Sequence, residues 1–152
     1  DTMTGGRIKR LEKYLDGEDF LLTYGDGLSD VDINASIKNY LENGKKLLMT
    51  VVRPPARFGE VSLKGSSVVT FEEKPQLNHG WINGGYCVCS NEILGHIDSD
   101  SEMFERGPMN KLCEENEINA FIHEGFWQCM DSKKDLEKLS EIWNSGNIPW
   151  KT

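Results

Sequence analysis

Two aspartates follow apolar runs at positions where a carboxylate could hold a metal ion. Asp26 comes after the run 19–24 and stands between two glycines, and Asp131 comes after the run 126–130. Ligands of open α/β sheets bind beyond the carboxyl ends of the strands, so both carboxylates should emerge at one sheet edge if their strands are parallel. Mg²⁺ is typically held by one or two carboxylates, with substrate phosphates and water completing its shell. The pattern therefore favours a Mg²⁺ site made by Asp26 and Asp131.

Each aspartate also has a plainer interpretation. An aspartate between glycines is typical of a tight bend, although the same glycines would leave room for a phosphate or nucleotide to approach the backbone. Asp131 could instead cap the helix that follows, beside Ser132. A calcium loop of the EF-hand type is excluded, because counting from Asp26 puts Leu28 where the second ligand belongs. The turn and capping interpretations stay open beside the metal interpretation.

Two further stretches carry groups that could bind a sugar phosphate. Glu73 and Lys74 precede Pro75. A lysine offers a phosphate a point charge, and a glutamate accepts hydrogen bonds from sugar hydroxyls, although a solvated strand end stopped by proline has the same pattern. Asn83 and Gly84 interrupt an apolar strand, which indicates either the close approach of a ligand or a β-bulge.

The first half of the chain predicts alternating helices and strands. Helical spacing of Ile8, Leu11 and Leu15 predicts a helix that begins at Thr4 as its cap and stops at Gly17. The run 19–24 is typical of a strand buried on both faces, and 47–52 has the same character. Between them a second amphipathic helix starts at Asp32 and ends at 43–44. Strand, helix and strand in one sheet indicate a parallel crossover.

The second half adds an antiparallel insertion to this α/β pattern. Short alternating segments split by 64–65 predict a hairpin, and helix caps are expected at Ser90 and at Ser132. Strands are expected at 81–90, 119–122 and 126–130, and a short helix at 92–97. A helical stretch interrupted at 107–108 is expected over 101–115, and a last helix follows Ser132. The predicted fold is α/β, with a mixed, mainly parallel sheet, helices on both faces and a small antiparallel insertion, in a single domain over 1–152.

Composition excludes several classes of protein. Of the 152 residues, 25 are acidic and 17 are basic, giving a net charge of -8 without any basic block, so a nucleic-acid partner is not expected. No apolar run approaches the length of a membrane span. The three histidines lack the partners of a catalytic triad, and the four cysteines lack zinc-ligand spacing. The cysteines are expected to be reduced core thiols of a cytoplasmic protein.

Seven segments in this order resemble the sugar-phosphate nucleotidyltransferases, in particular the branch that transfers a cytidylyl group to glucose 1-phosphate. They are TGGRIKR, TYGDGLSDVDI, PPARFGEV, FEEKP, INGGY, FWQCMDS and IPWKT. The resemblance covers the chain from end to end. It implies a Rossmann-like nucleotide-diphospho-sugar transferase fold and an enzyme that joins a nucleoside triphosphate, here CTP, to a sugar 1-phosphate and releases pyrophosphate.

The same resemblance implies roles for individual residues. Asp26 and Asp131 would be the Mg²⁺ pair, and with Lys74 they would be the catalytic residues. Glu73 and Lys74 would hold the sugar and its phosphate. The remaining substrate-binding residues would be Gly59, Asn83 and Gly84 on the sugar side and Thr4, Gly6, Arg7 and Gly25 on the nucleotide side. The family also implies a homo-oligomer, either a trimer or a hexamer.

One departure from the family pattern limits these expectations. The family opens with a Gly-rich loop and a lysine that bind the triphosphate, and this sequence contains neither. The expectation is therefore that the chain is the C-terminal portion of such an enzyme, inactive unless an N-terminal portion completes it. Two alternatives stay open: a nucleotidyltransferase for another base or sugar, and a non-catalytic module for sugar-phosphate binding or assembly.

Overall fold

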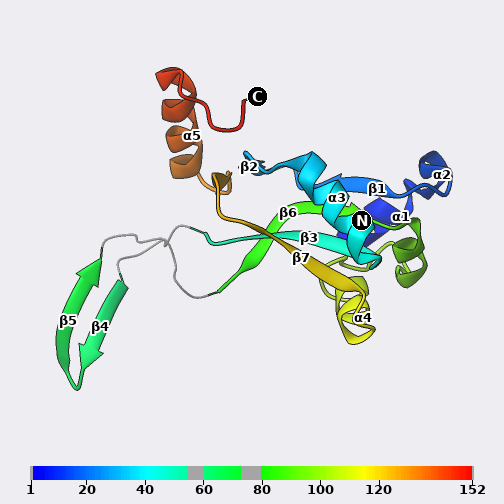
Figure 1. Cartoon of the computed structure of the whole chain (residues 1–152), viewed down its shortest axis with the longest axis horizontal. Helices are drawn as coiled ribbons and strands as arrows, with labels where there is room; N and C mark the ends of the chain where they lie inside the picture. The colour runs from blue at the N-terminus through cyan, green and yellow to red at the C-terminus, as the bar shows by residue number, and fades with distance from the viewer. Residues whose placement is uncertain (1, 55–59, 73–79, 152) are drawn as a thin grey trace. The chain divides into compact units, whose positions relative to one another are not determined.

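The structure is a computed structural model that describes residues 2–54, 60–72 and 80–151 (Figure 1). Two compact units are distinguished within the chain. Unit 1 comprises Asp1–Gly25, Asp32–Thr50 and Gly85–Phe121, and unit 2 comprises Asp26–Val31, Val51–Gly84 and Ile122–Thr152. The single domain expected over 1–152 stays a prediction.

A four-stranded sheet is the central element, with the strand order β1-β6-β3-β7. Its strands are β1 (Phe20–Thr23), β3 (Leu47–Val52), β6 (Ile82–Cys89) and β7 (Ile118–His123) (Figure 1). Two short ladders accompany it, β2 (Gly27–Ser29) with β8 (Trp127–Cys129) and β4 (Glu60–Lys64) with β5 (Ser67–Glu72). The α/β class, the mixed sheet and the antiparallel hairpin predicted from the sequence are confirmed.

The directions of the strands differ from the prediction of a mainly parallel sheet. β6 pairs antiparallel with β1. The amide of Ser90, just after β6, donates to the carbonyl of Lys46, just before β3, so β6 is antiparallel to β3 as well. The beginnings of β3 and β7 are joined by a bond from Leu47 N to Glu117 O, as in a parallel pair. Pairing is therefore mostly antiparallel, because β6 returns from the hairpin insertion and runs between β1 and β3.

Helices cover both faces of the sheet, as predicted. On one face Leu47 and Cys89 pack in a core with side chains from three helices. These are α1 (Thr4–Lys9), η1 (Asn91–His96) and α4 (Pro108–Glu114). On the other face Leu48 and Val88 pack with Tyr40 and Ile37 of α3 (Ile33–Asn43) and with Phe121 of β7. The prediction that β1 is buried on both faces is wrong, since it is an edge strand whose Leu21 is 55% exposed.

The helix predicted from Thr4 onwards is split in two. α1 (Thr4–Lys9) has Met3 as its N-cap residue, so Thr4 is the first helical residue and not the cap. α2 (Glu12–Leu15) ends at Asp16, which adopts a left-handed conformation one residue before the predicted stop. A break at 10–11 leaves Leu11 exposed, although its spacing had placed it on the buried face.

Local capping signals in the other helices are confirmed. Asp32 accepts from the amide of Ala35 at the start of α3 (Ile33–Asn43), which ends at Gly44 in a left-handed conformation. Ser90 caps η1 (Asn91–His96). Ser132 caps α5 (Lys133–Ser145) in a complete capping box with Asp135. The predicted interruption at 107–108 is confirmed, since α4 (Pro108–Glu114) begins at the proline after Gly107. The part of the predicted helix before it, 101–106, is not helical.

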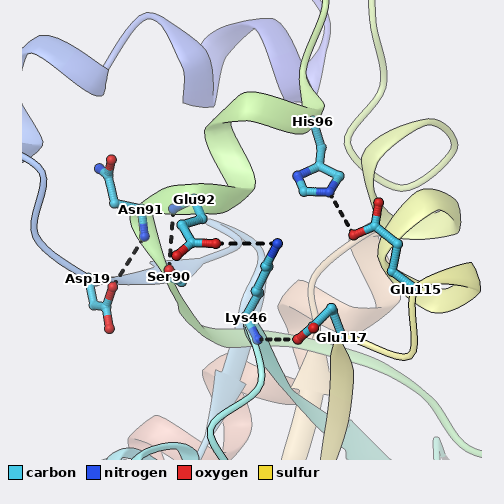
Figure 2. Close-up of polar contacts among 8 residues, drawn as sticks. All are labelled: Asp19, Lys46, Ser90, Asn91, Glu92, His96, Glu115 and Glu117. Carbon is cyan, nitrogen blue, oxygen red and sulfur yellow. Dashed lines mark hydrogen bonds and ion pairs between the residues drawn. The ribbon is translucent and has the colours of Figure 1, made fainter.

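Polar contacts fix η1 at the amino ends of β3 and β7 (Figure 2). The Lys46 ammonium pairs with Glu92 at 3.3 Å, and the Lys46 amide donates to Glu117. Asp19 accepts from the amide of Asn91. These contacts lie at the amino ends of β1 and β3. Ligands of α/β sheets are expected at the opposite edge, beyond the carboxyl ends of the strands.

Among the residues described, no helix combines the length and apolar content that crossing a bilayer requires.

Candidate functional site

Asp26 and Asp131 lie at the same end of the β2–β8 ladder, within unit 2. Gly27 opposes Cys129 in this antiparallel pair, and the Met130 amide donates to the Asp26 carbonyl at 2.8 Å. The backbone of Asp26 therefore contacts the residue that precedes Asp131. Both aspartates are exposed. The two aspartates are not brought together by parallel strands of one sheet, as predicted, since β8 pairs antiparallel with β2 and lies outside the four-stranded sheet.

The turn interpretation of Asp26 holds for its backbone, since 25–26 form a turn. It does not account for Gly25. The φ angle of Gly25 is not in the left-handed region, and a Cβ built there meets nothing within 4 Å. Within the described part of the chain neither strain nor packing requires a glycine at this position. The space next to Gly25 would therefore let a ligand approach the backbone.

The capping interpretation of Asp131 is not supported. Ser132 is the N-cap residue of α5, and its hydroxyl accepts from the Asp135 amide. Asp131 instead accepts a hydrogen bond from the Cys129 thiol at 3.4 Å through Oδ2. Its exposed carboxylate precedes the cap, on the strand side of the helix start.

The donor set around Asp26 suits a cation that arrives with its own phosphate ligands. Among the described parts of the chain, no group of three or more His, Cys, Asp or Glu side chains could hold a metal ion. Mg²⁺ keeps several waters and is commonly bound through one or two carboxylates plus substrate phosphates. Two exposed aspartates at one ladder end fit that mode of binding, and they do not fit an all-protein cage.

Asn83 and Gly84 follow Ile82, the first residue of β6, and a tryptophan from β8 contacts Gly84. The Trp127 indole donates to the Gly84 carbonyl at 2.8 Å. Asn83, Gly84, Asp26 and Asp131 are thereby arranged around one strand pair of unit 2. Trp127 was missed from the sequence, because an aromatic residue in a strand is usually a core residue. The neighbouring Gly85 has a φ of 80°, so part of this glycine pair serves the backbone of β6.

Arg53 is a second residue that the sequence analysis missed. It follows β3 directly, and its guanidinium lies 4.4 Å from the centre of the Trp81 ring. Its Nε is buried and has no hydrogen-bond partner among the residues that the structure describes. The sequence did contain a signal for Arg53, because a positively charged residue directly after a buried strand indicates a binding site at the carboxyl end of that strand.

Thr4, Gly6 and Arg7 lie in α1 of unit 1, where two of them have packing roles. The Thr4 hydroxyl donates to Glu105 at 2.7 Å and accepts from the Phe104 amide. A Cβ on Gly6 would lie 2.3 Å from the Asp100 carbonyl oxygen, so glycine is required there. Arg7 is exposed and donates to the Thr2 carbonyl.

The Glu105 carboxylate is held in its charged form. Partial burial raises its pKa, but hydrogen bonds from the hydroxyls of Tyr24 and Thr4 outweigh this effect, and the net pKa lies below the ordinary value. Glu105 thus anchors α1 to the segment before α4.

Comparison with curated proteins identifies close relatives. The glucose-1-phosphate cytidylyltransferase of Salmonella typhimurium is 43% identical over 152 residues, which is 99% of this chain and 59% of that protein. The probable glucose-1-phosphate cytidylyltransferase of Bacillus subtilis is 34% identical over the same shares of both chains. The resemblance to the sugar-phosphate nucleotidyltransferases is confirmed. No protein-family model matches the chain.

The fold of this chain is also found among solved structures. The crystal structure of HddC from Yersinia pseudotuberculosis complexed with GMP-PN matches with a TM-score of 0.68 at 24% identity, covering 93% of this chain and 63% of that one. The chain spans 59% of the length of the curated cytidylyltransferases it matches.

Three of the residues expected from the nucleotidyltransferase resemblance lie outside the described residues. They are Gly59, Glu73 and Lys74. Their roles on the sugar side stay predictions.

Proposed function

We propose that, in a protein of its relatives' full length, this chain supplies the sugar side and the metal-binding pair of an enzyme that transfers a cytidylyl group from CTP to glucose 1-phosphate. The supporting observation is the 43% identity over nearly the whole chain, combined with the placement of Asp26 and Asp131 at one ladder end. The products would be CDP-glucose and pyrophosphate.

Asp26 and Asp131 would hold Mg²⁺ against the phosphates of the nucleotide. The bound ion would supply charge compensation for the phosphoryl oxygens. The exposure of both residues supports this role, since a hydrated cation approaches from the solvent. The open space at Gly25 would admit the phosphate that brings the remaining ligands.

The reaction needs positioning more than it needs a covalent intermediate. A sugar-phosphate oxygen would attack the α-phosphorus in line, the new P–O bond would form, and the bond to pyrophosphate would break. Lys74 would neutralise the sugar phosphate and Glu73 would accept from sugar hydroxyls, with Gly59, Asn83 and Gly84 lining the sugar pocket. On the nucleotide side Arg7 would act directly, whereas Thr4 and Gly6 would act by holding α1 in place.

A coupled pyrophosphate-release assay tests this function. A protein of full family length should turn over CTP and glucose 1-phosphate with Mg²⁺, and should use dTTP and UTP more slowly. Turnover with dTTP or UTP but not with CTP would show that the enzyme uses a base other than cytosine. Absence of turnover with every base would reject the enzyme.

For the chain by itself, a narrower function is compatible with its 59% coverage of the relatives. It would bind a sugar phosphate, or assemble, without catalysis. Titration calorimetry with glucose 1-phosphate on the isolated chain distinguishes this alternative, because binding or defined oligomers without turnover are required. Finding neither would remove it.

The proposed setting is a homo-oligomer, trimeric or hexameric, in the cytoplasm. The four cysteines, all within the described residues, form no disulfide, which supports a reducing compartment. Light scattering on the purified protein would give the mass that tests the assembly.

A further inference from the structure

Arg53 is a cation whose donors are not used by the described part of the chain. Its Nε is buried and has no hydrogen-bond partner there, whereas its two Nη groups are not among the buried atoms that lack a partner. No ion pair between described residues includes Arg53. A partly desolvated charge without a counter-charge costs free energy. Such a group indicates an acceptor that the described residues do not supply.

Contact with Trp81 fixes the position of this guanidinium. The Cζ atom of Arg53 lies over the indole, 4.4 Å from the ring centre, where a cation is attracted by the π electrons. Trp81 is 39% exposed and Arg53 is half-buried, so the pair lies at the surface, where a ligand can reach it. A guanidinium that is positioned in advance loses less conformational entropy when it binds an anion.

The Arg53–Trp81 pair stands at the sheet edge where ligands of α/β folds bind. Arg53 directly follows β3, and Asp26 follows β1. Both strands are antiparallel to β6, which lies between them, so their carboxyl ends share one edge. Trp81 directly precedes β6 and therefore belongs to this edge as well. All three residues belong to unit 2, with Arg53 on the β3 side of β6 and Asp26 on the β1 side.

We propose that Arg53 binds the phosphate group of the sugar 1-phosphate, with its two Nη groups donating to two phosphate oxygens. A planar guanidinium matches two oxygens of a phosphate, a geometry that the point charge of a lysine does not offer. The buried Nε marks a partly dehydrated cation, whose attraction to an anion is less screened than in water.

The position of Arg53 favours the sugar phosphate over the nucleotide. Asp26 and Asp131 would serve the phosphates of the nucleotide, so the anion left for a cation on the other side of β6 is that of the second substrate. Asn83 and Gly84, which are expected to line the sugar pocket, follow Trp81 within three residues. The identity of the ligand rests on the proposed function, whereas the observation of an unpaired guanidinium does not.

Titration calorimetry on a protein of full family length tests this assignment, with Mg²⁺ and each substrate alone. The test variant is Arg53→Met, which keeps an unbranched stem against Trp81 and removes the charge and the donors. The matched control is Arg10→Gln, which removes an arginine that pairs with Asp100. We expect Arg53→Met to raise the Kd of glucose 1-phosphate at least about tenfold and to leave that of CTP unchanged. The control should leave both constants unchanged.

A second variant keeps the test valid if Arg53→Met does not fold. Arg53→Lys should raise the Kd of glucose 1-phosphate less, and again without an effect on CTP, because lysine keeps the charge and loses the paired bonds. A structural role for Arg53 predicts weaker binding of both substrates, and that result would overturn the assignment. Weaker binding of CTP alone, no change for either substrate, or a wild type that does not bind glucose 1-phosphate would also overturn it.

Failure of this assignment and failure of the proposed function give different results. Binding of glucose 1-phosphate that depends on Arg53, without pyrophosphate release from CTP, would reject cytidylyl transfer and support the role of Arg53. Turnover of CTP and glucose 1-phosphate, with unchanged binding in Arg53→Met, would support the transfer and overturn the role of Arg53.

Discussion

At the residue scale, Gly6 and Gly25 illustrate two different reasons for a glycine. A Cβ on Gly6 would overlap the backbone of Asp100, whereas a Cβ on Gly25 would enter open space. The Gly-Gly motif of α1 suggested a nucleotide contact from the sequence, and packing between segments distant in the chain could not be seen there. Gly25, the first glycine of the GDG motif, is the opposite case. Neither its φ angle nor a contact with the described residues requires a glycine there.

We therefore predict opposite outcomes for two alanine substitutions. Gly6→Ala should lower the free energy of unfolding by about 1–3 kcal/mol, because the new methyl group forces α1 away from the 98–105 segment. Gly25→Ala should change it by less than about 0.5 kcal/mol. Urea denaturation measures both. Equal losses would contradict the assigned contacts.

Glu105 leads to a prediction about pH. Its lowered pKa means that its contribution to stability is present above the ordinary glutamate pKa and is lost as the pH falls through the folded-state value. Glu105→Gln should cost about 1 kcal/mol at neutral pH, a low figure because the carboxylate is partly exposed. The difference from wild type should shrink in acid. Urea denaturation at neutral pH and below about pH 4 checks this. A difference that persists in acid would assign the loss to packing.

Thiol reactivity follows from burial. Burial raises the pKa of Cys87 to about 12 and also raises that of Cys89, while Cys113 is exposed. The expectation that all four cysteines are core thiols is wrong for Cys113. Ellman's reagent at mildly alkaline pH should label Cys113 quickly and leave Cys87 and Cys89 protected until denaturant is added. Mass spectrometry of the labelled peptides identifies the sites, and rapid labelling of Cys87 would contradict the packing.

At the element scale, the best sequence predictions were those with a local cause. Capping residues and apolar runs correctly located α3, β3, the hairpin and α5 to within a residue or two. The direction of β6 was not predictable, because it depends on pairing with strands far away in the sequence. β2 and β8 have three residues each, too few for a periodic pattern, and the proximity of Asp26 to Asp131 depends on their pairing.

The capping box of α5 can be tested by itself. Ser132→Ala should lower the free energy of unfolding by about 1 kcal/mol. The Asp135 amide loses its acceptor, and the reciprocal bond from the Ser132 amide to the Asp135 carboxylate is no longer held in place by the hydroxyl. Ser140→Ala is the control, since that hydroxyl only bonds the Leu136 carbonyl inside the helix. Urea denaturation should show a lower free energy of unfolding for Ser132→Ala and no change for Ser140→Ala. Equal effects of the two substitutions would contradict the role of the cap.

At the scale of the whole molecule, the candidate residues are divided between the two units. Asp26, Asn83, Gly84 and Asp131 belong to unit 2, and those of α1 belong to unit 1. The sequence could indicate the metal pair through its motifs, but it could not distinguish Asp131 from a helix cap. That distinction needed the observed cap at Ser132.

The central claim is that Asp26 and Asp131 bind the Mg²⁺ used in cytidylyl transfer. The most direct measurement is the rate of pyrophosphate release from CTP and glucose 1-phosphate by a protein of full family length, for Asp26→Asn, Asp131→Asn and the control Asp32→Asn. Asp32 caps α3, a duty that asparagine performs equally well. We expect the first two variants to lose at least about a hundredfold in rate and the control to keep wild-type activity. Wild-type rates in either of the first two variants would contradict the account.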